Sequence, residues 1–271
     1  MNIYDINGNI VSSNGGSDSF FEVVSETTGK KLQPKAEYQS GYYRGMTLNS
    51  HFKTFFEENF SLFAPNLATM QTKGKSLYIG GDSLHAYSGG DGMASSGFVT
   101  DYNQYLGFSN VKNDGYAGST WTGTTGGGGI KRVTDLVANG VPYDVFVLAW
   151  GTNDDTGGNG TIDDEASNAE GCTMVSAMKW CISQLRTTFR YSAIGVIIPP
   201  PKGTNEGMKE KGDLMIQVCE QMHVPYKDMR KYLSMDDMSG DTVHLGYGAD
   251  KYGSAEAQLI LDICPYGEPL Q

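Results

Sequence analysis

The sequence has little positive charge and few charged residues of either sign. Lys and Arg number 20 against 31 Asp and Glu, so the net charge is −11, and only 19% of the residues are charged. No run of Lys or Arg offsets this acidity, which makes a nucleic-acid backbone and an anionic membrane surface unfavourable partners. We therefore expect no nucleic-acid binding.

Long apolar segments are also missing. The longest runs, such as residues 193–201, are far shorter than the roughly 20 residues of a transmembrane helix. The start of the chain, Met1 to Asp5, has neither the basic segment nor the apolar stretch of a secretory signal. The sequence therefore predicts a protein made in the cytoplasm and not inserted in a membrane.

Cysteine is scarce, with four residues and no C-x-x-C spacing, which argues against a zinc site or a redox dithiol. Cys172 and Cys181 fall on a helix predicted over 170–189, where they would lie about 13 Å apart along the axis, too far for a disulfide. We expect no metal or other cofactor. All four thiols are predicted to be buried and free: Cys172, Cys181, Cys219 and Cys264.

Glycine, by contrast, is abundant: 36 of the 271 residues, against a usual share of about 7%. The glycines have no three-residue period, which excludes collagen. Aromatic residues make up 11% of the chain and hydrophobic residues 39%, which argues against a disordered chain. The glycines must therefore serve turns, loops or close backbone contacts.

The chain divides near residue 72, and residues 1–71 form an N-terminal extension. Asn7-Gly8 between short apolar segments predicts a β-hairpin. Four phenylalanines at helical spacing predict a helix over 49–60, whose aromatic side either packs on the neighbouring domain or docks a partner. These phenylalanines are Phe52, Phe55, Phe56 and Phe60.

Residues 72–271 alternate between predicted strands and helices. The strands are expected at 76–80, 110–113, 144–150, 193–198 and 224–227, and the helices at 98–106, 130–138, 170–189, 205–222 and 249–263. This alternation predicts an α/β domain with a parallel sheet and helices on both faces. In such folds ligands bind beyond the carboxyl ends of the strands, which directs attention to the residues that follow each strand.

Polar groups suited to acyl transfer follow the first three strands. Ser83 lies in a tight turn after Gly80-Gly81, where its hydroxyl can be exposed, although the G-x-S-x-G elbow of α/β-hydrolases is absent. A glycine such as Gly118 lets a backbone N–H approach a substrate oxygen closely. The Asn153 amide is a fixed donor of the kind found in oxyanion holes.

A fourth group, Asp241 to His244, precedes the last helix. A His three residues after an Asp can donate its Nδ1–H to that carboxylate, leaving Nε2 to take a proton from a serine. Together the four groups resemble, in order, the conserved blocks of the SGNH (GDSL) hydrolase family and its carbohydrate acetylesterases, over about residues 75–271. The matching residues are Gly81-Asp82-Ser83-Leu84, Gly118, Gly151-Thr152-Asn153-Asp154 and Asp241-Thr242-Val243-His244.

This resemblance implies a flavodoxin-like three-layer α/β/α sandwich and metal-free ester hydrolysis through a serine acyl-enzyme. Carried over by motif, Ser83 is the nucleophile, His244 the general base and Asp241 its orienting carboxylate. The oxyanion hole is then formed by the Ser83 N–H, the Gly118 N–H and the Asn153 side chain.

Other residues near the blocks are open to two interpretations. His85, Trp121 and Asp154 are candidates for substrate binding, but a solvent-facing His85 without function and a structural Asp154 are the favoured alternatives. The acidic, glycine-rich segment 154–168 is either a mobile lid or a surface loop. It does not fit a calcium loop, because Gly157 and Ala166 occupy positions that need oxygen ligands.

The leading hypothesis is a serine esterase that removes short acyl groups, most plausibly acetyl, from a carbohydrate. Three observations favour this hypothesis: the resemblance to a family that includes carbohydrate acetylesterases, the aromatic residues near the blocks, and the lack of an apolar lid. The aromatic residues are Tyr87, Tyr102 and Trp121. A lipase or thioesterase of the same fold is an alternative. Another is a virion protein that keeps the fold to bind glycans, because the extension and composition are similar to phage tail-associated hydrolases. A virion component would form a homo-oligomer or dock a virion partner through residues 1–71.

Overall fold

The computed structural model describes residues 71–86, 97–154, 158–203, 206–246 and 248–265, together with four two-residue strands nearer the N-terminus. The chain forms two compact units, Met1–Pro65 and Asn66–Gln271. In the first unit, β1 (Ile3–Tyr4) pairs antiparallel with β2 (Ile10–Val11) across Asn7-Gly8, as the hairpin signal predicted, and β3 (Val23–Val24) pairs with β4 (Lys31–Leu32). The predicted aromatic helix over 49–60 lies outside the described residues.

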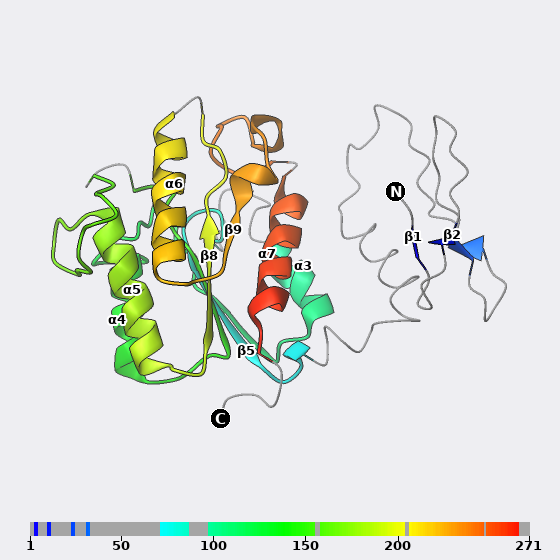
Figure 1. The fold of residues 1–271 in the computed structure, drawn as a ribbon, viewed down its shortest axis with the longest axis horizontal. Coiled ribbons are helices and arrows are strands. Elements are labelled where there is room, and N and C mark those ends of the chain that lie inside the picture. Colours follow the sequence, from blue (N-terminus) through cyan, green and yellow to red (C-terminus); the bar gives the residue numbers. More distant parts are fainter. Residues whose placement is uncertain are drawn as a thin grey trace. The chain divides into compact units, whose positions relative to one another are not determined.

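The second unit is built on a five-stranded parallel sheet (Figure 1). Its strands lie in the order β6-β5-β7-β8-β9, and every neighbouring pair is parallel. This is the flavodoxin-like order 2-1-3-4-5, which confirms the predicted fold class. The strands are β5 (Ser76–Gly81), β6 (Asn110–Asn113), β7 (Val145–Ala149), β8 (Ala193–Ile198) and β9 (Tyr226–Asp228).

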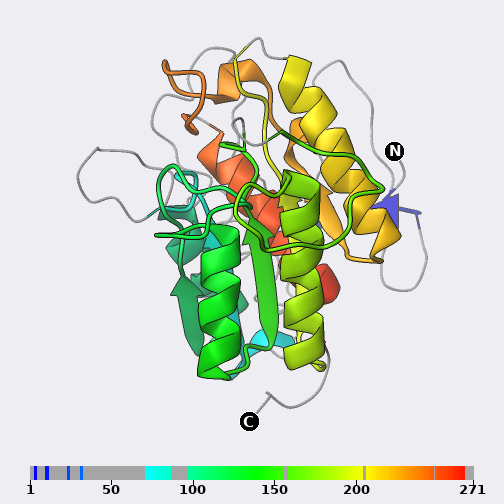
Figure 2. The same cartoon turned by 90° about the vertical axis from the view of Figure 1, so that its left-hand side faces the viewer.

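Helices cover both faces of the sheet. Helices α4 (Gly129–Asn139), α5 (Met174–Thr188) and α6 (Glu206–Gln221) lie on one face, where Figure 2 shows them in front of the sheet. Helices α3 (Gly97–Leu106) and α7 (Ala249–Ile263) pack together on the other face. Two short 3₁₀ turns, Met229–Lys231 and Met235–Asp237, follow β9. None of the helices in this described part of the chain is long and apolar enough to cross a membrane.

Successive strand residues enter two separate hydrophobic cores. Phe146 and Leu148 point to the core beneath α4, α5 and α6, whereas Val145 and Val147 point to the core beneath α3 and α7. Because both faces are covered, β7 is buried along its whole length, and this explains its unbroken apolar sequence.

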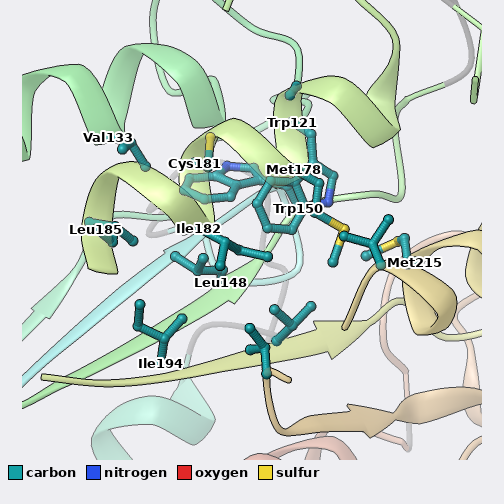
Figure 3. Close-up of a cluster of buried hydrophobic side chains, with 14 of the residues drawn as sticks. Trp121, Val133, Leu148, Trp150, Met178, Cys181, Ile182, Leu185, Ile194 and Met215 are labelled. Carbon is teal, nitrogen blue, oxygen red and sulfur yellow. The ribbon is translucent and has the colours of Figure 1, made fainter. Parts of the chain in front are cut away.

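The core on the α5 side is centred on two tryptophans (Figure 3). The rings of Trp121 and Trp150 meet edge to face, with centroids 5.2 Å apart. Burial of such a side chain contributes about 1.5–3 kcal/mol. The predicted core face of α5 is buried here as expected: Met174, Met178, Cys181 and Leu185.

Helix α5 and strand β9 both begin later than predicted. Helix α5 begins at Met174 because the Thr173 side chain accepts a hydrogen bond from Ser176 N–H and caps the first turn. Cys172 therefore lies before the helix and is only partly buried, so the prediction of four buried thiols is wrong for this residue; the other three are buried and free. Strand β9 begins at Tyr226, two residues later than predicted.

Candidate active site

Ser83 lies in a tight turn directly after β5, the strand that lies between β6 and β7 in the sheet, so that the chain leaves β5 for β6 on one side and then crosses from β6 to β7 on the other. His85 N–H donates to Asp82 O at 3.1 Å, and the Asp82 carboxylate accepts Leu84 N–H at 3.0 Å. The Asp82 side chain thus closes the turn. The turn sits at the topological switch point of the sheet, where α/β folds bind ligands.

The structure brings His244 and Asp241 to this serine. His244 Nε2 lies 3.0 Å from Ser83 Oγ, and His244 Nδ1 lies 2.5 Å from Asp241 Oδ2. With Nδ1 donating to the carboxylate, Nε2 is left as an acceptor for the serine hydroxyl. Residues 161 positions apart in the sequence therefore form a continuous Ser–His–Asp chain of hydrogen bonds.

Asp241 is held as an anion by several donors. Besides the His244 ring, its carboxylate accepts the backbone N–H groups of His244 at 2.9 Å and Val243 at 3.0 Å, and the Ser239 hydroxyl at 2.5 Å. These hydrogen bonds, that of the His244 ring foremost, hold the pKa of Asp241 well below its usual range. A fixed negative charge therefore faces His244 Nδ1.

The other two sequence blocks meet beside the serine turn. Ser119 connects them, because its hydroxyl donates to Gly81 O at 2.9 Å and its carbonyl accepts Asn153 Nδ2–H at 3.1 Å. Gly118, just before Ser119, adopts φ +75°, a conformation that favours glycine. The three predicted oxyanion-hole residues therefore sit on loops that are hydrogen-bonded to one another.

Three hydrogen-bond donors around the Ser83 turn are available to a ligand. Within the described residues, the N–H groups of Ser83 and Gly118 donate to no protein acceptor. The Asn153 amide uses one of its two hydrogens on Ser119 O and keeps the second. Such donors can stabilise the negative oxygen of a tetrahedral intermediate.

Two of the candidate substrate-binding residues lie inside the protein. Trp121 is fully buried against Trp150. The Asp154 carboxylate is buried and accepts the backbone N–H groups of Trp121 at 3.0 Å and Thr122 at 3.4 Å. Burial raises the pKa of Asp154 to about 6. The substrate-binding interpretation is therefore corrected for both residues, and the structural alternative for Asp154 fits.

His85 was expected near the mouth of the site or in solvent, and the structure corrects this too. Its side chain is fully buried, with Nε2 3.1 Å from both carboxylate oxygens of Glu256 in α7. The sequence reasoning missed Glu256. The sequence did contain a signal for it. Glu256 is separated by three or four residues from the apolar residues Tyr252, Leu259 and Ile260, a spacing that places it on the buried face of the helix.

The segment after Asn153 is fastened to α5. Lys179 in α5 donates to Ile162 O at 2.5 Å and to Asp164 O at 2.9 Å. The Asp164 carboxylate accepts the hydroxyls of Thr161 at 2.8 Å and Thr173 at 2.6 Å. The lid interpretation therefore does not fit residues 158–168; residues 155–157 lie outside the described chain.

Within the part of the chain that the structure describes, no group of three or more His, Cys, Asp or Glu side chains is arranged to hold a metal ion.

Comparison with known proteins identifies the fold. No protein-family model and no curated protein matches the chain by sequence. By structure it is similar to a "possible lipase" from Chitinophaga pinensis, with a TM-score of 0.57 and 16% identity over 69% of this chain and 98% of that one. A proposed GDSL-like lipase from Bacteroides uniformis gives a TM-score of 0.51 and 16% identity, covering 70% and 96% of the two chains. For the acetyl xylan esterase AlAXEase, the TM-score is 0.50 and the sequence identity is 15%, over 68% of this chain and 99% of that one. The second unit of this chain therefore has the α/β fold of the SGNH (GDSL) hydrolases.

Proposed function

We propose that the chain is a serine esterase in which Ser83, His244 and Asp241 act as a catalytic triad. The observation that carries this proposal is the 3.0 Å contact between His244 Nε2 and Ser83 Oγ, with Asp241 bonded to the opposite ring nitrogen. That is the geometry in which a neutral imidazole can take the proton of an attacking hydroxyl.

The reaction proceeds in two halves. Ser83 Oγ attacks the ester carbonyl carbon while His244 Nε2 takes its proton, and the carbonyl oxygen becomes an oxyanion. The N–H groups of Ser83 and Gly118 and the Asn153 amide stabilise this oxyanion. His244 then returns the proton to the departing alkoxide, which leaves an acyl group on Ser83. Water then attacks the acyl carbon while His244 Nε2 takes its proton, and His244 returns this proton to Ser83 Oγ as the acyl–oxygen bond breaks and the acid leaves.

Asp241 supports both halves of the reaction. Each time His244 takes a proton it becomes a cation, and the anionic carboxylate 2.5 Å from Nδ1 stabilises this cation and fixes the ring orientation. Because three further donors hold the carboxylate, Asp241 does not have to reorganise as the charge on the ring changes.

We further propose that the substrate is a short acyl ester, an acetyl group, on a carbohydrate. One similar structure is an acetyl xylan esterase. Tyr116, two residues before Gly118, is 52% exposed, and its N–H is fixed to Gly81 O at 3.0 Å. An exposed aromatic ring on the oxyanion loop offers an apolar face and a hydroxyl to a sugar.

The test is acetate release from acetylated glycans, with Ser83→Ala as the inactive control. We expect release by the native chain, and faster hydrolysis of p-nitrophenyl acetate than of the octanoate. Equal or reversed rates on the two esters would contradict the acetyl assignment and favour a lipase.

The contribution of the carbohydrate is tested with a pair of tyrosine variants. Tyr116→Ala should raise KM for the glycan and leave p-nitrophenyl acetate unaffected. Tyr191→Ala is the matched control, because Tyr191 is 79% exposed but lies just before β8, at the amino-terminal ends of the parallel strands, whereas Tyr116 follows the carboxyl end of β6. An equal effect of the two changes on the glycan would contradict the role of Tyr116.

A further inference from the structure

A buried ion pair joins the turn that carries Ser83 to the helix that follows His244. His85 follows the nucleophile by two residues, and Glu256 lies in the middle of α7, the helix that follows His244. Both side chains are 0% exposed, and His85 Nε2 is 3.1 Å from each carboxylate oxygen. The mechanism proposed above uses neither residue.

His85 is enclosed by the ends of two strands as well as by α7. A Cβ atom on Gly81 would lie 2.7 Å from His85 Nδ1, and one on Gly115 would lie 2.6 Å from His85 Cβ, so only glycine fits at either position. Asn113, the last residue of β6, donates its side-chain amide to His85 O at 2.9 Å. The imidazole therefore cannot shift without moving the turn that carries Ser83.

Helix α7 also anchors the segment that carries His244. Gly248 N–H donates to Asp237 O at 2.9 Å, and Lys251 Nζ donates to Asp237 Oδ1 at 2.6 Å. Asp237 in turn accepts Gly246 N–H at 3.0 Å, just after His244. The same helix thus holds the base-bearing loop through Asp237 and the nucleophile turn through Glu256.

The charges around His85 favour its cationic form. Burial alone lowers the pKa of His85, but the Glu256 carboxylate, helped by Asp82, outweighs burial, and the pKa is raised. The Tyr252 ring packs edge-on at 5.4 Å. These are the titratable groups on the turn and on α7 that face the ring.

Stability alone is a weak reason for such a pair. Removing two charges from water is costly, and apolar residues of similar volume at buried ion pairs are often neutral or stabilising. What apolar residues do not supply is a directional bond between one fixed point on the turn and one on α7.

We infer that the His85–Glu256 pair positions Ser83 Oγ against His244 Nε2, acting through the turn and α7 rather than by contact with substrate. The inference rests on the proposed esterase function. A misplacement of about 1 Å in a reacting group can lower turnover about 100-fold, so the pair should act on kcat.

The experiment uses the full chain with p-nitrophenyl acetate and measures kcat, KM and Tm. Glu256→Gln removes one charge and keeps the shape, and the double variant His85→Leu with Glu256→Leu removes both charges. Lys75→Met is the control, because Lys75 is equally buried, bonds to Pro265 O and lies at the opposite end of β5.

We expect Glu256→Gln to lower kcat about 10- to 100-fold while KM stays within about twofold. The double variant should recover Tm relative to Glu256→Gln and keep the low kcat. Lys75→Met should lower Tm and leave kcat unchanged.

Wild-type kcat in either folded pair variant would overturn the inference, as would a kcat that recovers together with Tm in the double variant. Failure of both pair variants to fold would also overturn it, since the pair would then serve stability. No turnover by the native chain would instead refute the esterase function itself, so the two failures are distinguishable.

Discussion

Asp154 offers a quantitative test of how the loops behind Asn153 are held. Its buried carboxylate accepts two backbone N–H groups, from Trp121 and Thr122, and so ties the loop after Gly118 to the turn after β7. Burial raises the pKa of Asp154 to about 6, against the opposing effects of the Trp121 N–H and the Lys211 charge. The perturbation is Asp154→Asn, which keeps the shape and removes the ionisation.

The magnitude follows from proton linkage. Because the folded pKa is about 6 and the ordinary value is 3.8, the folded state binds the proton more tightly than the unfolded chain does. The contribution of Asp154 to the free energy of unfolding is therefore greatest below about pH 4 and falls as the pH rises towards 6, by a total of about 3 kcal/mol. Roughly half of this loss, about 1.5 kcal/mol, falls between about pH 5 and pH 8, away from the isoelectric point.

The assay is urea unfolding of both proteins across that pH range. Asp82 and His85 titrate in both proteins, so the difference between the two curves isolates Asp154. We predict that the stability of the native chain falls by about 1.5 kcal/mol relative to Asp154→Asn as the pH rises. Parallel curves would refute the reasoning.

Three further predictions concern the triad, the oxyanion hole and the extension. Asn153→Ala should lower kcat about 100- to 1,000-fold in steady-state assays, whereas a change in KM alone would assign Asn153 to binding. Asp241→Asn should lower kcat about 10⁴-fold with an unchanged circular dichroism spectrum, and a small loss would mean that another group orients His244. Removal of residues 1–65, the first compact unit, should leave turnover of p-nitrophenyl acetate intact and abolish any oligomer seen by size-exclusion chromatography. Lost turnover would show that the extension completes the site.

The strands of the sheet could be predicted because each one is marked by its own local sequence. A parallel strand covered by helices on both sides must be apolar throughout, as 145–149 and 194–198 are, and such runs stand out in a sequence. The end of a helix could be predicted where a single capping residue, such as a glycine, determines it. Gly140, with φ +67° and its N–H on Leu136 O, ends α4 at Asn139, one residue beyond the predicted end of the helix at 138.

The four sequence blocks meet around Ser83 in the structure, but the orientation of the side chains next to them could not be predicted from the sequence. His85 and Trp121 follow block residues closely, yet one pairs with Glu256, 171 positions away, and the other packs in the core. Likewise, glycines and acidic residues indicated a loop after Asn153, while the bond from Lys179 that fixes it depends on tertiary structure.

The glycine excess has a physical account at the site. Gly118 takes up a left-handed conformation in the loop after β6, and Gly81 and Gly115 leave room for His85. The docking role of residues 1–71, a homo-oligomer, a virion partner and the cellular location stay predictions.

The central claim, that Ser83 is a nucleophile activated by His244, is tested most directly by labelling with a fluorophosphonate and mapping the adduct by mass spectrometry. The account predicts one adduct, on Ser83, that is absent in Ser83→Ala and forms far more slowly in His244→Ala. An adduct on another residue, or equal labelling of Ser83→Ala, would contradict it.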